Sequence, residues 1–211
     1  MADKAILIDQ IISAEWDMFE ATKNRGGKAD CQEDPVTFRI MRDAQFEAWS
    51  EEVLSSYQQD LAQAAHEGRN PLSEKYGYMM RWTHPKEFEE IKEYLPPVSE
   101  EKHRLIIDIL QIQMGQTAEF MKAYPFLANS GRPVYQIDGN ATTSIEVYGY
   151  GEMATYSMRT LNLFKNHLIE LENEGKSYQQ MVVENTTRAY GYASLEEAEK
   201  ASRWECRSCG K

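Results

Sequence analysis

Polar residues interrupt a helical pattern in the stretch Tyr148-Gly-Tyr-Gly-Glu-Met-Ala-Thr-Tyr-Ser-Met-Arg159. Each of the two glycines inside it costs roughly 1 kcal/mol relative to alanine in a helix. Glu152, Tyr156 and Arg159 recur at three- and four-residue spacing, so they share one side of the predicted helix. A helix keeps such residues where a neighbour approaches its backbone closely or where a buried polar network is held. The stretch therefore predicts a helical protein with a polar interior.

Helix start signals recur on both sides of this stretch. Thr143 with Glu146 forms a capping box that predicts a helix over 144–173. Asp34 followed by Pro35 predicts a long helix that ends near His66. Similar patterns predict helices over 4–22, 71–83, 86–95 and 100–123, a long loop over 124–140, and two helices that start after Ser177 and Ser194.

Alternation of β-branched and polar residues, the pattern of strands, is nearly absent. We therefore predict an all-α protein, with one helical-bundle-like domain over residues 1–201 and about eight helices. A short tail that contains a Cys-x-x-Cys motif is expected over 202–211.

Composition excludes several classes of protein. The 211 residues suffice for one hydrophobic core, and the net charge of −11 with no basic stripe disfavours nucleic acid and anionic membranes as partners. No apolar run approaches the roughly 18 residues of a membrane span, and the N-terminus lacks a signal-peptide layout. Three cysteines, an odd number, do not suggest a disulfide framework, so a cytoplasmic protein is expected.

Two polar residues fall on helix faces that otherwise look buried. Glu15 lies in the apolar stripe of the first predicted helix, and Arg42 precedes Phe46 and Trp49 on the stripe of the second. A buried carboxylate must be paired, hydrogen-bonded or protonated, because removing its water without compensation is costly. Arg42 and Arg159 are the expected partners of Glu15 and Glu152.

Two interpretations of these residues remain open. One is an active or binding site for a small anionic metabolite inside the bundle, between the first, second and sixth predicted helices. Its parts would be two acid–base or anchoring carboxylates, two arginines for the anionic group and two hydrogen-bonding tyrosines: Glu15 and Glu152, Arg42 and Arg159, Tyr148 and Tyr156. The other is a buried network that only fixes how the helices pack.

The C-terminal residues suggest a metal site. Cys206 and Cys209 are three apart and are followed by Gly210, a spacing that lets two thiolates grip one zinc or iron ion. A closed tetrahedral site needs four ligands, so a second chain would complete it across a homodimer. A redox-active dithiol or an end without a metal are the alternatives. The glycine-rich segment 26–32 fits a turn between two helices better than a phosphate loop.

Six ordered segments resemble a bacterial family catalogued as a domain of unknown function, number 4125: Glu15–Phe19, Gly26–Gln32, Met41–Trp49, Glu74–Met80, Tyr150–Ser157 and Tyr190–Glu199. The resemblance covers most of the chain and implies no particular reaction. Some members of that family are joined to nucleotidyltransferase-like domains. The resemblance thus implies an alternative function, an accessory or binding module for a separate enzyme such as a nucleotidyltransferase.

Overall fold

A computed structural model describes residues 2–23, 27, 30–129, 132–136 and 143–208, with 2–3, 30–31 and 204–208 described by their backbone alone. These residues form α-helices, two short 3₁₀-helices and no strand, which confirms the all-α prediction. In chain order the elements are α1 (Ala2–Glu20), η1 (Asp30–Glu33), α2 (Pro35–Glu47), α3 (Glu51–His66), α4 (Pro71–Thr83), α5 (Pro85–Ile91), η2 (Lys92–Tyr94), α6 (Glu100–Ala123), α7 (Pro125–Asn129), α8 (Ile145–Ala154), α9 (Met158–Asn173), α10 (Tyr178–Ala189) and α11 (Leu195–Ser208).

The expected number of about eight helices is wrong, because both long predicted helices are broken. The first breaks at Ser50, whose side chain accepts a hydrogen bond from the Val53 amide and caps α3. The second breaks at Ser157, which caps α9 in the same way. Trp49 precedes the first cap and Tyr156 the second, and their rings pack edge to face with centroids 6.0 Å apart. Both breaks therefore turn the chain around one aromatic core.

Two further differences lie near the C-terminus. A short helix, α7, lies within the predicted loop, where the Glu199 carboxylate accepts hydrogen bonds from the Phe126 and Leu127 amides. Helix α11 continues to Ser208 through most of the expected tail. Cys209 and the side chain of Cys206 lie outside the described residues, so the metal site stays a prediction. The residues that are described hold no group of three or more metal-ligating side chains.

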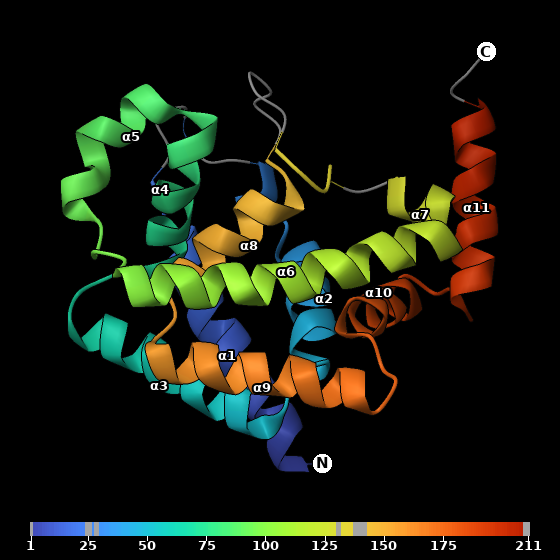
Figure 1. The fold of residues 1–211 in the computed structure, drawn as a ribbon, viewed down its shortest axis with the longest axis horizontal. Helices are drawn as coiled ribbons and strands as arrows, with labels where there is room; N and C mark the ends of the chain where they lie inside the picture. Colours follow the sequence, from blue (N-terminus) through green and yellow to red (C-terminus); the bar gives the residue numbers. More distant parts are fainter. Residues whose placement is uncertain (1, 24–26, 28–29, 130–131, 137–142, 209–211) are drawn as a thin grey trace.

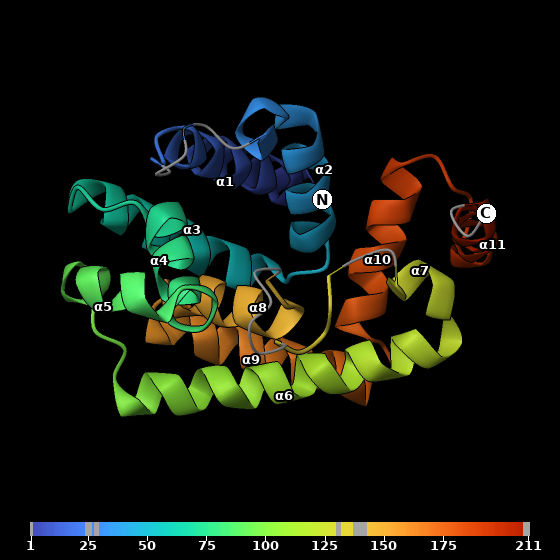
Figure 2. The same cartoon turned by 90° about the horizontal axis from the view of Figure 1, so that it is seen from above.

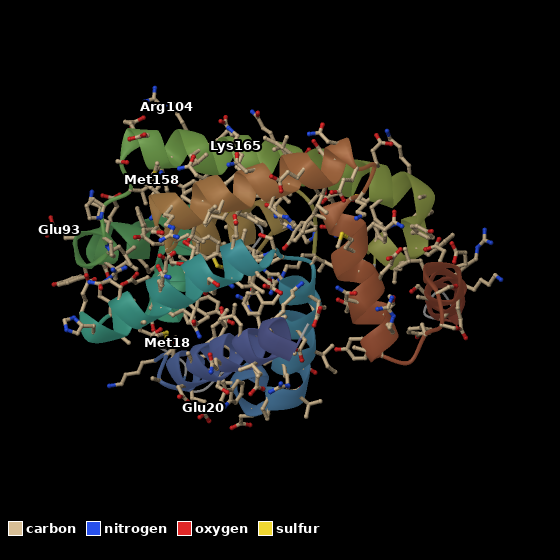
Figure 3. The ribbon with its side chains drawn as sticks, turned by 90° about the horizontal axis from the view of Figure 1, so that it is seen from below. Met18, Glu20, Glu93, Arg104, Met158 and Lys165 are labelled. Atoms are coloured by element: carbon tan, nitrogen blue, oxygen red, sulfur yellow. The ribbon has the colours of Figure 1, made fainter. Side chains whose placement is uncertain are left out.

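The helices pack around one long member. Helix α6 crosses the middle of the view in Figure 1 and runs along one side of the molecule in Figure 2, with α8, α9 and α10 packed against it. Helices α1 and α2 lie on the opposite side, and α7, α10 and α11 gather at one end (Figure 2). The side chain of Arg104 on α6 lies at the outer edge of the view, and Lys165 on α9 lies beside α6, where it pairs with Asp108 (Figure 3). Over the described ranges, no helix is both long and apolar enough to cross a membrane.

Gly151 permits the close packing of α8 on α4. A β-carbon at this position would lie 2.6 Å from Met79 Cγ and 2.8 Å from the backbone oxygen of Lys75. Real β-carbons do not approach other atoms so closely, and a backbone atom cannot swing aside. The interpretation of Gly151 as a point of close approach is therefore correct, and this contact places Lys75 beside Glu152.

We expect Gly151→Ala to lower the free energy of unfolding by about 1 to 2 kcal/mol, since overpacking outweighs the better helix propensity of alanine. Gly115, in the middle of α6, is the matched control, because a β-carbon there meets nothing within 4 Å. Gly115→Ala should raise the free energy of unfolding by up to about 1 kcal/mol. Urea denaturation of both variants tests this, and effects of the same sign would contradict it.

Candidate functional site

A guanidinium joins two carboxylates in the interior of the bundle. Arg42 Nε and Nη2 donate to the two carboxylate oxygens of Glu15 across 2.6 and 2.5 Å. Nη1 donates to Glu152 Oε1 across 2.6 Å and to Gln45 Oε1 across 2.8 Å. The Tyr57 hydroxyl donates to Glu15 Oε1 across 2.7 Å. These residues, together with Tyr156, which also hydrogen-bonds Glu152, form what we call the Arg42 network.

The charged residues and Tyr57 of this network come from four helices, and each lies on the buried face of its helix. Glu15 comes from α1, Arg42 from α2, Tyr57 from α3 and Glu152 from α8. Glu15 is fully buried, and Arg42 and Glu152 are exposed by only 6% and 8%. Their pairing satisfies the requirement that a buried charge has hydrogen-bonded partners of opposite sign.

The charges of Glu152 and Arg42 are fixed at neutral pH. Burial alone would raise the pKa of Glu152. The charges of Arg42 and Lys75, with the hydrogen bonds from Arg42 and Tyr156, outweigh burial and hold this pKa at about 2. Burial would lower the pKa of Arg42, yet the facing carboxylates raise it well above its ordinary value. Burial and nearby carboxylates raise the pKa of the Tyr57 and Tyr156 hydroxyls. Glu152 is thus suited to holding positions rather than to transferring protons.

Arg159 does not join the Arg42 network. Its side chain is exposed and its Nη1 donates to Gln59 Oε1 across 3.4 Å. The break before Ser157 ends the helix that carries Glu152, so the three- and four-residue spacing does not extend to Arg159. The expectation that Arg159 pairs with a buried carboxylate is therefore wrong.

A cavity of about 500 Å³ adjoins the Arg42 network, and its lining includes the exposed residues Met41 and Arg132. Residues of α1, α2, α4, α6, α8 and α10 line it. Its polar lining includes Arg42, Gln45, Lys75, Glu152 and Tyr178, together with Asp34, Thr37, Gln113, Arg132 and Gln179. Much of the remaining wall is apolar or aromatic and includes Phe19, Phe38, Leu72, Ile145 and Val182.

Lys75 is a feature of this cavity that the sequence analysis missed. It is only 3% exposed, and its ammonium nitrogen lies 3.9 Å from Glu152 Oε2 and 3.6 Å from the centroid of the Tyr148 ring. Within the part of the chain that the structure describes, this ammonium makes no hydrogen bond. The sequence spacing does indicate that Lys75 is buried, because it follows Leu72 by three residues and precedes Met79 by four on the buried stripe of α4.

Arg132 and Tyr178 also contribute polar groups to the cavity. The guanidinium carbon of Arg132 lies 5.0 Å from the centroid of the same Tyr148 ring that Lys75 contacts. The Tyr178 hydroxyl accepts hydrogen bonds from Trp49 Nε1, at 3.1 Å, and from Gln45. Because both of these groups donate to the hydroxyl oxygen, the phenolic hydrogen of Tyr178 is available to donate a hydrogen bond to a ligand in the cavity.

Comparison with known proteins places the chain in a family. Residues 5–200 match the family described as protein of unknown function (DUF4125), in agreement with the resemblance seen in the sequence. No curated protein and no solved structure matches the chain. The family match spans the Arg42 network and the whole lining of the cavity. The chain therefore belongs to the DUF4125 family of proteins of unknown function.

Proposed function

We propose that the chain binds a small organic anion in this cavity, and that Lys75 receives the negative charge of the ligand. The observation that carries the proposal is the buried ammonium of Lys75, which lines the cavity without a hydrogen bond to the described residues. An ammonium has three donors, and buried donors are normally hydrogen-bonded. An anionic ligand in the cavity would supply the acceptors that this group lacks.

The size and lining of the cavity support the same proposal. Sites for small molecules are usually concave, between about 300 and 1,000 Å³, with apolar walls and a few convergent polar groups. The cavity of about 500 Å³ has such walls and places Lys75, Tyr178 and Arg132 around one space. Tyr148, which contacts both cations, forms part of the same surface.

The Arg42 network has a different role in this proposal. A guanidinium carries five N–H donors, and Arg42 already directs four hydrogen bonds to Glu15, Glu152 and Gln45. Arg42 therefore has only one N–H donor left for an anionic ligand. Arg42 therefore holds Glu152 in place, and Glu152 in turn holds Lys75 at the cavity. The candidate site thus shifts from Arg42 and Arg159 to Lys75 and Arg132, supported from behind by the buried network.

A thermal-shift screen of metabolite anions tests the proposal. A ligand that binds only the folded state raises the melting temperature, by an amount that grows with its concentration relative to Kd. We expect at least one anion to raise the melting temperature of the wild type, and Lys75→Met to lose this response. Lys165→Met is the control, because Lys165 pairs with Asp108 on the outer surface. An equal response from the wild type and Lys75→Met would contradict the proposal.

A further inference from the structure

We infer that the ligand is a monocarboxylate with an apolar body rather than a phosphate ester, a deduction that rests on the proposed function. In the cavity, the Lys75 ammonium, which makes no hydrogen bond to the residues that the structure describes, lies next to the ionised carboxylate of Glu152 and faces a largely apolar wall. The charges around the cavity, the type of donor at its polar end and the nature of its walls each support this class.

The charges around the cavity balance before any ligand enters. Arg42, Lys75 and Arg132 are cations, and Glu152 and Asp34 are the carboxylates in the lining. Glu15 lies behind Arg42 and supplies the third negative charge. A dianionic phosphate ester would therefore add two negative charges to a neutral site, close to Glu152. A monocarboxylate adds only one.

The donors at the polar end fit a carboxylate. Phosphate sites typically use bidentate arginines or clustered backbone amides. Here Arg42 is already occupied by protein carboxylates, while Lys75 offers a point charge and Tyr178 a single hydroxyl. One ammonium and one hydroxyl can serve the two oxygens of a carboxylate, with Arg132 adding positive charge from the exposed rim.

The walls fit an apolar body. The Phe19 and Phe38 rings stack with centroids 5.2 Å apart, and Tyr76 lies 6.3 Å from Phe19. All three line the cavity together with Leu72 and Ile145. Covering these surfaces with an apolar group removes them from water, which favours binding roughly in proportion to the area covered. An anion without such a body would leave the wall exposed.

Isothermal titration calorimetry with matched probes tests the inference. The first series is octanoate, octanamide and octyl phosphate, and the second is cinnamate, cinnamamide and cinnamyl phosphate. We expect at least one carboxylate to bind the wild type about tenfold tighter than its amide, the effect of one charge-assisted hydrogen bond. The same carboxylate should also bind more tightly than the phosphate of its series.

Three variants locate the binding. Lys75→Met should weaken carboxylate binding about tenfold, to the level of the amide, and leave amide binding unchanged. Arg132→Gln keeps the buried network intact, because Arg132 is exposed, and should weaken carboxylate binding about two- to fivefold. Arg159→Gln is the matched control, an exposed arginine away from the cavity lining, and should bind as the wild type does.

The outcomes separate this inference from the proposed function. Tighter binding of the phosphates, with the same dependence on Lys75, would overturn the inference and leave the binding of an organic anion standing. Equal binding of each carboxylate and its amide would overturn the inference, because the charge would then not be recognised. Failure of every anion, both in these series and in the thermal-shift screen, would overturn the proposed function as well.

Discussion

Replacement of Arg42 by methionine is expected to lower the free energy of unfolding by about 3 to 5 kcal/mol, the usual effect of removing one partner of a buried ion pair. Glu15, which is fully buried, would lose both hydrogen bonds to the guanidinium, and Glu152 would lose its closest cation. Because domains of this kind are stable by only about 5 to 15 kcal/mol, the variant should unfold at much lower urea concentration. Urea denaturation followed by circular dichroism measures the change.

Arg39 offers a control on the same helix. It lies one turn before Arg42, is exposed, and pairs with Asp9 at 2.6 Å and Asp43 at 3.4 Å. Arg39→Met should change the free energy of unfolding by less than about 1 kcal/mol, because solvent screens such pairs. Adding Glu15→Gln to Arg42→Met should recover part of the loss, since a neutral amide then replaces the unpaired carboxylate of Glu15, while Glu152 keeps Lys75 as its ionic partner. Equal effects of Arg39→Met and Arg42→Met would show that the buried pairing is not important for stability.

Capping residues let the sequence predict many helix boundaries. Asn70 with Pro71, Ser99 and Ser177 begin helices in the structure where the sequence places them. The breaks at Ser50 and Ser157 were missed because the apolar pattern continues across both turns. That pattern continues for a tertiary reason, since Trp49 and Tyr156, which directly precede the two breaks, belong to one aromatic core. Periodicity along the chain reports burial, and burial alone does not distinguish one long helix from two.

The buried half of the site was predictable and the half that faces the cavity was not. Glu15, Arg42 and Glu152 are recognisable in the sequence because charged side chains interrupt apolar stripes. The requirement that buried charges pair then predicts that these residues meet. Lys75 is harder to recognise, because its long aliphatic stem packs on an apolar stripe as readily as a hydrophobic side chain does. Arg132 lies outside any helix, so no periodicity places it. Its approach to Tyr148 depends on how the chain returns to α8.

The stability of the protein should fall in acid in a way that depends on Glu152. The pKa of this carboxyl group is about 2 in the folded protein, against 4.5 for its ordinary value. A carboxyl group whose pKa is lowered on folding stabilises the protein at pH values above its pKa in the unfolded chain. This contribution disappears as the pH falls through its pKa in the folded protein. The difference between the two pKa values of Glu152 corresponds to about 3 kcal/mol in the free energy of unfolding. About 2 kcal/mol of this should be lost between pH 6 and pH 3.

Glu152→Gln isolates this contribution from the other carboxylates, because protonated Glu152 and glutamine are both neutral and nearly the same size. In urea denaturation the variant should be less stable than the wild type at pH 6, and the difference in the free energy of unfolding should shrink by about 2 kcal/mol as the pH falls to 3. Glu174→Gln is the control, since that carboxylate pairs with Lys176 at the exposed surface, and its stability should run nearly parallel to that of the wild type. A constant difference between Glu152→Gln and the wild type across this range would mean that Glu152 is not held as an ion in the folded protein. The ionic contact of Glu152 with Lys75 at 3.9 Å would then not hold that side chain beside the cavity.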